Sequence, residues 1–162
     1  MILLSDANVL MDLGHMHGLN VLVQLAPIEV LDVVLNECHH HSQPTLIADI
    51  RAAGIKEIKA QLSWFESMAP YAGKRLSLQD QLNLYYAETF SRTLLTNERP
   101  LREVCRQRNI AVHGTLWIIA EVHSRQILAP HTLCKWLDVL SDLDRRLPAQ
   151  EVELLRQTLN CS

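Results

Sequence analysis

Short apolar segments alternate with helical patterns along most of this 162-residue chain. Residues 2–5 and 28–31 have the apolar pattern of buried strands, and each precedes residues with helical spacing. From residue 77 the order is helix, strand, helix, strand, helix, with strand patterns at 93–96 and 110–112. Such alternation predicts a parallel sheet with helices on both faces. Right-handed crossovers would then bring the carboxyl ends of the strands to one edge.

Capping residues mark several of the expected helices. Ser77 is a good N-cap, and Asp80, three residues later, can complete a capping box. Gly14 is a suitable stop for a helix that starts near residue 8, and Asp32 can cap a helix that reaches about residue 40. Residues 55–60 alternate polar and apolar side chains, which predicts one more, half-buried strand.

The C-terminal region differs from the rest of the chain. Residues 130–158 carry helical apolar spacing and no strand pattern, with a break at Pro148. They predict a pair of helices. We therefore expect a sheet domain over residues 1–128 and a helical extension over 129–162 that packs on this domain or on a partner.

Charge and cysteine content bound the class of protein. Lys and Arg total 15 against 18 Asp and Glu, so an overall basic coat for nucleic acid is absent, although a local site can differ. Four cysteines lie at positions 38, 105, 134 and 161, outside any C-x-x-C pair, which fits a reducing cytosol better than a disulfide framework. No apolar run approaches the roughly 18 residues that span a bilayer. We expect a soluble, cytoplasmic protein without a membrane partner.

Four acidic residues follow the expected strands or begin the helices beside them. Asp6 follows the first strand, and Glu37 lies on the helix that the second strand feeds. Asp80 begins the helix at 77–91, and Glu98 follows the strand before it reaches the next helix. We expect these four carboxylates to meet at the carboxyl edge of the sheet.

Clustered carboxylates repel one another by about 4 kcal/mol per pair at roughly 4 Å and an effective dielectric of 20. A cluster is tolerated when some acids stay protonated or when a cation lies among them. Oxygen ligands of this kind suit Mg²⁺ or Mn²⁺, and metals so held serve phosphodiester hydrolysis. The alternative is that each acid only caps a helix, and Asp80 has a complete capping explanation.

Four motifs in order resemble a known family. Residues 2–10 (Ile-Leu-Leu-Ser-Asp-Ala-Asn-Val-Leu) resemble the opening of a PIN domain, and residues 77–80 resemble its acidic helix start. Residues 94–102 resemble its strand, Thr-x-Asp turn and following helix, with Glu98 where the family usually has Asp. Residues 110–116 resemble the next strand and the Gly-Thr turn of bacterial, toxin-like (VapC-type) PIN ribonucleases.

The resemblance covers about residues 1–125 and implies a three-layer α/β/α fold. Its central parallel sheet would have four or five strands, with the C-terminal helices as an addition. It also implies a metal-dependent ribonuclease that uses Mg²⁺ or Mn²⁺. The implied catalytic and metal-ligating residues are Asp6, Glu37, Asp80 and Glu98, with Asn8 and Thr96 as residues that orient ligands or water.

The implied function is an endoribonuclease, the toxin of a type II toxin–antitoxin system. Its partners would be an RNA substrate, an antitoxin protein and a second copy of the chain. Two alternatives stay open: a catalytically degenerate PIN-like module that binds RNA or protein, and an interaction protein that works through the helices after residue 128.

Two further groups of side chains have competing interpretations. A zinc site at His39, His40 and His41 is disfavoured because adjacent residues on a helix point about 100° apart. Several basic residues near the acidic edge form either a path for RNA phosphates or a solvated basic face. These residues are Lys74, Arg75, Arg99, Arg102, Arg106 and Arg108.

Overall fold

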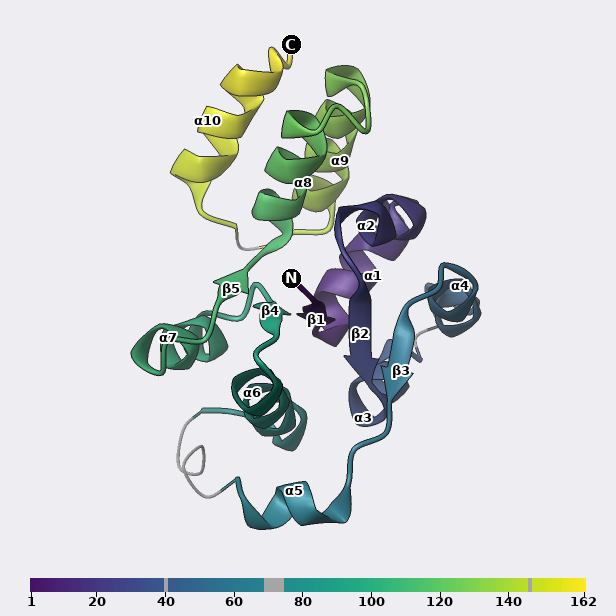
Figure 1. The fold of residues 1–162 in the computed structure, drawn as a ribbon. Helices are drawn as coiled ribbons and strands as arrows, with labels where there is room; N and C mark the ends of the chain where they lie inside the picture. Colours follow the sequence, from purple (N-terminus) through teal and green to yellow (C-terminus); the bar gives the residue numbers. More distant parts are fainter. Residues whose placement is uncertain (40, 69–74, 146) are drawn as a thin grey trace.

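A computed structural model describes residues 1–39, 41–68, 75–145 and 147–162. Its central sheet has five parallel strands in the order β3-β2-β1-β4-β5 (Figure 1). The strands are β1 (Leu3–Ser5), β2 (Ile28–Leu31), β3 (Lys56–Ile58), β4 (Thr93–Leu95) and β5 (Val112–His113). The parallel sheet that alternation predicts is therefore present, and the predicted roles of His40 and Lys74 lie outside the described residues.

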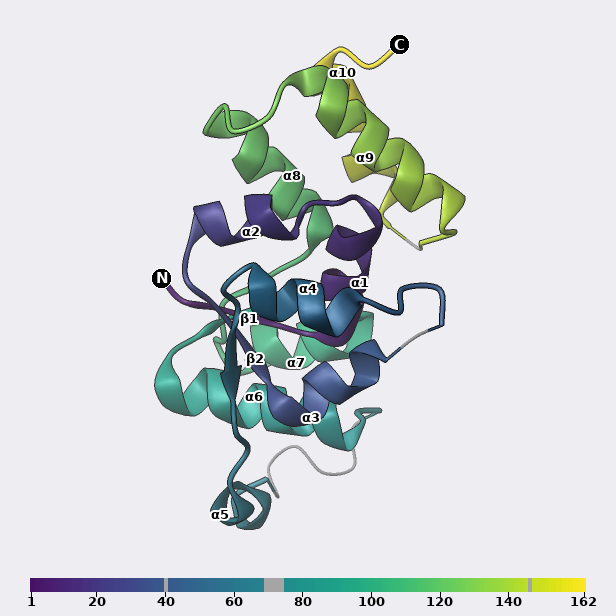
Figure 2. The ribbon, with the colours of Figure 1, turned by 90° about the vertical axis from the view of Figure 1, so that its right-hand side faces the viewer.

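Helices connect the strands and cover both faces of the sheet, which gives the three-layer α/β/α arrangement that the sequence predicts (Figures 1 and 2). A 3₁₀ turn, η1 (Asn36–Cys38), continues the short helix after β2. The α-helices are α1 (Ala7–His15), α2 (Leu19–Leu25), α3 (Asp32–Leu35), α4 (Leu46–Ala52), α5 (Leu62–Glu66), α6 (Leu78–Phe90), α7 (Arg99–Gln107), α8 (Thr115–Ser124), α9 (Pro130–Asp142) and α10 (Ala149–Leu159).

Asp32 does not cap a helix as expected. The N-cap of α3 is Leu31, and Asp32 is the first helical residue. Its Oδ1 accepts hydrogen bonds from the backbone N–H groups of Val33 at 2.8 Å and Ala60 at 3.1 Å. Asp32 therefore ties the residues after β3 to the start of α3.

The strands β1 and β4 lie in the middle of the sheet and are wholly buried. A buried carboxylate on the neighbouring strand is paired. Glu29 of β2 is 5% exposed and accepts hydrogen bonds from Arg92 Nε at 2.7 Å and the Tyr86 hydroxyl at 2.9 Å. Such pairing offsets the large cost of removing a charge from water.

The C-terminal helices α9 and α10 pack against α8 and each other (Figure 1). Leu133, Trp136 and Leu140 of α9 are buried in the same hydrophobic core as the sheet residues. Trp136 also packs on Gly18, where an added Cβ would lie 2.7 Å from its ring. The helical pair is thus present, while its separation at residue 128 into a distinct extension stays a prediction.

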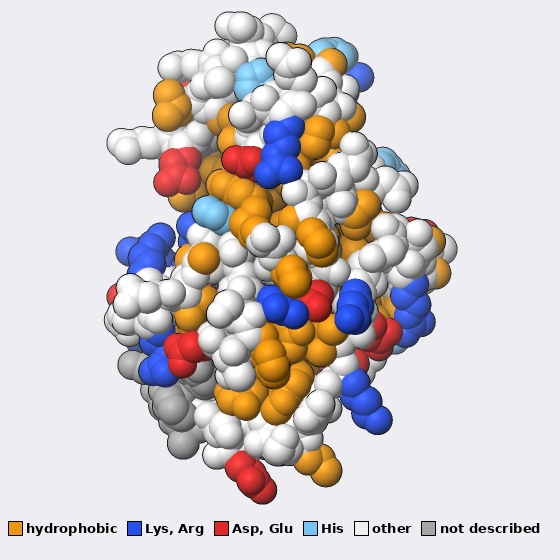
Figure 3. All heavy atoms as spheres, in the orientation of Figure 1, with side chains coloured by type: hydrophobic (Ala, Val, Ile, Leu, Met, Phe, Trp, Pro, Cys, Tyr) orange, Lys and Arg blue, Asp and Glu red, His pale blue; other side chains and the backbone are white. Residues whose placement is uncertain are grey.

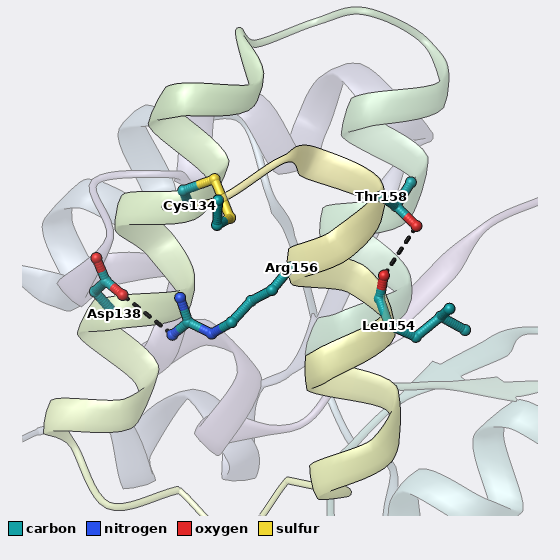
Figure 4. The surroundings of a disulfide bond; sticks show 6 residues. Cys134, Asp138, Leu154, Arg156 and Thr158 are labelled. Carbon is teal, nitrogen blue, oxygen red and sulfur yellow. Dashed lines mark hydrogen bonds and ion pairs between the residues drawn. A yellow bond between two sulfur atoms is a disulfide. The ribbon is translucent and has the colours of Figure 1, made fainter.

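The cysteine prediction is wrong for one pair. Cys134 near the start of α9 and Cys161 just after α10 form a disulfide, whereas Cys38 and Cys105 are free and buried (Figure 4). The two bonded residues are 27 apart in sequence, and their Cα atoms lie 5.7 Å apart. The helices fold back on each other and bring the two thiols together. This tertiary contact cannot be predicted from the spacing of the cysteines in the sequence. Among the described helices, none is long and apolar enough to cross a membrane.

Candidate active site

Asp6 follows β1 and begins α1. Its backbone N–H donates to the carbonyl of Leu95 at 3.0 Å, which extends the pairing of β1 with β4 by one residue. Its side chain caps α1 by accepting the Val9 N–H at 2.8 Å. Asp6 is only 5% exposed, so the local structure holds an ionisable group below the surface of the sheet edge.

The turn after β4 supplies the next residues. Thr96 is fully buried, and its hydroxyl accepts the N–H of Glu98 at 3.1 Å. The Thr96 side chain also hydrogen-bonds to the Asp6 carboxylate. The exposed Asn8 donates through Nδ2 to Glu98 Oε1 at 2.8 Å. Asn8 and Thr96 therefore connect the two acids that follow β1 and β4.

Asp80 lies at the start of α6, where the predicted capping box is present. Ser77 Oγ accepts the Asp80 N–H at 3.1 Å, and Asp80 Oδ2 accepts the Ser77 N–H at 3.4 Å. The cap occupies only part of the hydrogen-bonding capacity of this half-buried carboxylate, which has about four lone-pair sites. The capping role therefore leaves room for a second role.

Glu37 comes from a different local structure than expected. It lies in the 3₁₀ turn η1, which packs against α1, and its side chain is exposed. The predicted α-helix ends at Leu35 and tightens into this turn. Despite the tighter turn, Glu37 lines the same cavity as the other three acids.

That cavity has a volume of about 140 Å³ and lies at the carboxyl edge of the sheet. The structure thus brings together the four acids that the sequence singles out, from four separate segments. The lining residues are Asp6, Ala7, Asn8, Val34, Glu37, Ser77, Gln79, Asp80, Asn83 and Glu98. We call this space the acidic cavity.

Burial and mutual repulsion disfavour ionisation of these acids. Burial raises the pKa of Asp6 to about 7, with a further rise from Asp80 and Glu98, against the lowering by hydrogen bonds from Thr96 and Val9. Burial also raises the pKa of Asp80 and that of Glu37, and the charge of Asp80 adds to the rise at Glu37. The cavity is an environment in which carboxylates lack a compensating positive charge.

Asn83 is a lining residue that sequence reasoning missed. It lies three residues after Asp80 on α6, so both side chains share one helix face. Asn83 is 1% exposed, and its Oδ1 has no hydrogen-bond partner. The sequence carries no signal for this residue, because its burial is visible only in the fold.

These observations test whether a divalent cation suits the acidic cavity. As they stand, no three His, Cys, Asp or Glu side chains of the described residues are arranged so that they could hold a metal ion. The donor set nevertheless has the right chemistry: four carboxylates and the unpartnered Asn83 oxygen line one cavity. Repulsion among uncompensated acids keeps such groups apart, and a cation would reverse that preference. The residues fit a cation in kind.

The position of the cavity agrees with the topology of the sheet. The chain passes from β1 to β2 on one side and reaches β4 on the other, so the strand order reverses at β1. In open α/β sheets, binding sites lie outside the carboxyl ends of the strands at such a reversal. Asp6 and Glu98 follow the two strands that flank this point.

Comparison with known proteins gives the family. A family model described as a PIN domain matches residues 2–160, which is nearly the whole chain and includes α9 and α10. No curated protein matches the sequence. PIN domains are generally nucleases, which agrees with an acidic cavity at the edge of a parallel sheet. With this match and the three-layer fold around a five-stranded parallel sheet, the chain belongs to the PIN-domain family.

Proposed function

We propose that this PIN-domain protein is a divalent-metal-dependent endoribonuclease that hydrolyses RNA at the acidic cavity. The observation that carries the proposal is the meeting of Asp6, Glu37, Asp80 and Glu98 in one cavity of about 140 Å³. A site rich in carboxylates repels a phosphodiester unless a cation offsets their charge. Membership of a family of nucleases supplies the class of reaction.

The residues that would hold Mg²⁺ or Mn²⁺ are the four acids, with the Asn83 oxygen inside the same cavity. When bound, the metal supplies charge neutralisation at the phosphate and activation of water for attack on phosphorus. Asp6 is held by its cap on α1 and by Thr96, so its carboxylate is fixed in advance. A fixed carboxylate presents a ligand oxygen without a large loss of side-chain entropy.

Asn8 and Glu98 act as a pair at the rim of the cavity. The Asn8 amide donates to Glu98 Oε1 and orients this longer side chain, which stands where the family usually has Asp. The second oxygen of Glu98 is left to face the cavity or the substrate. The extra methylene of Glu98 is therefore compatible with a ligand role, because its reach is controlled by a neighbour.

RNA as the substrate and the toxin of a type II toxin–antitoxin system as the biological role remain proposals that rest on the sequence resemblance. An antitoxin and a second copy of the chain are the proposed protein partners. Single-stranded or looped RNA suits an open edge site, because its backbone and bases are accessible there.

The test is cleavage of a single-stranded RNA by the purified full chain with Mg²⁺, Mn²⁺ or EDTA. Cleavage is expected with the metals and not with EDTA. Asp80→Asn keeps an oxygen to accept the Ser77 N–H, so the helix cap survives while the ligand charge is lost. We expect its rate to fall by about 100-fold or more. Asp138→Asn on α9 is the matched control, because this exposed acid pairs with Arg156 away from the cavity.

The second candidate function is a catalytically degenerate module that binds RNA or protein. The observation in its favour is that, although the four acids line one cavity, no three His, Cys, Asp or Glu side chains of the described residues are placed so that they could hold a metal ion. It predicts that wild type cleaves no RNA with either metal. Cleavage that survives EDTA and Asp80→Asn would contradict the metal-dependent proposal directly.

A further inference from the structure

A second cavity, of about 520 Å³, lies beside the acidic cavity. It is formed by the turns after β4 and β5, by α7 and α8, and by the start of α10. Figure 3 shows blue and pale-blue side chains gathered on the left of the view, at the notch between the regions of α7 and α10. We call this space the arginine cavity; its main side chains are Arg99, Arg102, Arg106, His113, Trp117 and Glu151.

Three arginines of α7 give this cavity its charge. Arg99, Arg102 and Arg106 are three and four residues apart, so they share one helix face. None of them takes part in an ion pair among the described residues. Burial and the neighbouring Arg106 lower the pKa of Arg102, against the opposing effect of Glu151. Three positive groups facing one carboxylate leave an excess of positive charge in the cavity, which favours the binding of an anion.

An aromatic pair forms part of the same wall. The rings of His113 and Trp117 are stacked, with centroids 4.1 Å apart and planes inclined by 4°. Both side chains are half-buried. Flat aromatic groups beside arginines are the combination that proteins use for single-stranded nucleic acids: arginines bind phosphates and aromatic faces stack with bases.

The arginine cavity and the acidic cavity share one short turn. Asn97 lines the first and Glu98 the second, although they are neighbours in the chain. Arg102 Nη1 donates to the Thr96 carbonyl at 3.1 Å, and Asn97 Nδ2 donates to Thr115 Oγ1 at 2.8 Å. These bonds fix the turn between β4 and α7, so the positions of the two cavities relative to each other are also fixed.

We propose that the arginine cavity is a nucleotide subsite for the strand that is cut at the acidic cavity. The proposal rests on the proposed nuclease function and names its substrate as a single-stranded nucleic acid. A phosphate next to the scissile one lies on Arg99 and Arg106, and the attached base lies against the His113–Trp117 pair. The volume of about 520 Å³ falls in the range of sites for small organic ligands, roughly 300–1,000 Å³.

Affinity for a fluorescently labelled, single-stranded oligoribonucleotide tests this inference. The full chain is titrated in EDTA at several salt concentrations, so that binding is read without cleavage. The double variant Arg99→Gln/Arg106→Gln is expected to bind about 10- to 100-fold more weakly, because two charge-assisted contacts are lost. The dependence of log K on log salt should become shallower by about 0.7 for each lost phosphate contact.

The control is Arg108→Gln, which removes one positive charge two residues beyond Arg106, where the double variant removes two. Arg108 is paired with Glu88 of α6 and does not line the cavity, so affinity should change less than about twofold. His113→Ala is expected to weaken binding by about fivefold or more while the salt dependence stays that of wild type, because stacking involves no counterion. Circular dichroism checks that each variant is folded.

The outcomes separate the subsite from the nuclease proposal. Loss of binding in the double variant supports the subsite even if wild type cleaves no RNA. Equal binding by wild type and the double variant overturns the subsite even if wild type is an active nuclease. Absence of binding by wild type also overturns it. Two results would show that the ligand is not a nucleic-acid strand. One is arginine-dependent binding of a poly-glutamate peptide and not of RNA; the other is a nucleoside monophosphate that competes with the labelled RNA as well as unlabelled RNA does.

Discussion

The substitution Asp6→Asn is expected to stabilise the metal-free protein while it removes a ligand. Asp6 has a pKa of about 7 in the folded chain, against 3.8 as its ordinary value. The folded state therefore holds the proton in a range where the unfolded state releases it. Stability is lost as the pH rises from about 4 to about 7 and stays low above that range.

The size of the effect follows from these two pKa values. Each pH unit between them costs about 1.4 kcal/mol, so ionisation of Asp6 lowers the free energy of unfolding by about 4 kcal/mol near pH 8. Near pH 5 the cost is about 2 kcal/mol, because this pH lies only a little more than one unit above the ordinary pKa of 3.8. Asparagine is uncharged and is a good N-cap, so it avoids this cost and can still accept the Val9 N–H.

Urea denaturation in EDTA, followed by circular dichroism, measures the difference. Asp6→Asn should exceed wild type in stability, with the excess growing by about 2 kcal/mol between about pH 5 and pH 8. Asp138→Asn is the control, because this acid is exposed and should show no such growth. A variant less stable than wild type at every pH, or an excess that does not change with pH, would refute the reasoning.

Three further substitutions test the fold. Cys161→Ser should lower the free energy of unfolding by about 3 kcal/mol in oxidising buffer, and wild type in a reductant should have the same lowered stability. A wild-type melting temperature that is the same with and without reductant would contradict this. Gly114→Ala should lower the free energy of unfolding, measured by urea denaturation, by about 1–3 kcal/mol, because the added Cβ would lie 2.5 Å from the Asn97 amide oxygen. Unchanged stability would contradict this close approach. Arg92→Ala should lower the free energy of unfolding by about 3 kcal/mol, because it leaves the buried Glu29 with Tyr86 as its hydrogen-bond donor. Thermal denaturation measures this loss, and a negligible loss would contradict the prediction.

Four of the five strands were predictable because each lies in a short apolar run that ends at a polar residue, and β3 was predictable from the alternation of polar and apolar side chains. The 28–31 strand and the Ser77 capping box agree with the structure residue by residue. Local rules of capping and periodicity act within a few residues, so they can be read without the fold. The convergence of four acids follows from topology, since parallel strands put their carboxyl ends at one edge.

The remaining features depend on tertiary contacts. The pairing of Cys134 with Cys161 requires α9 and α10 to fold back on each other, which sequence spacing does not encode. The 3₁₀ turn that carries Glu37 replaces a predicted α-helix, because its conformation depends on packing against α1. Asn83 looks like an ordinary helical residue until its neighbours show that it is buried without a partner.

The arginine cavity shows the same limit in another form. The basic residues of α7 are visible in the sequence, but a solvated face and a path for phosphates remain equal interpretations there. Only the fold shows that His113, Trp117 and α10 complete the walls around Arg102 and Arg106. The net charge of −3 therefore hides two adjacent cavities of opposite charge.

The most direct test of the acidic cavity as a divalent-cation site is a Mn²⁺ titration of the full chain, read by electron paramagnetic resonance. Wild type is expected to bind Mn²⁺ at this site, and Asp6→Asn, which stays folded and gains stability without metal, is expected to bind it at least about 10-fold more weakly. Equal affinity of wild type and Asp6→Asn for Mn²⁺ would contradict the proposed metal site.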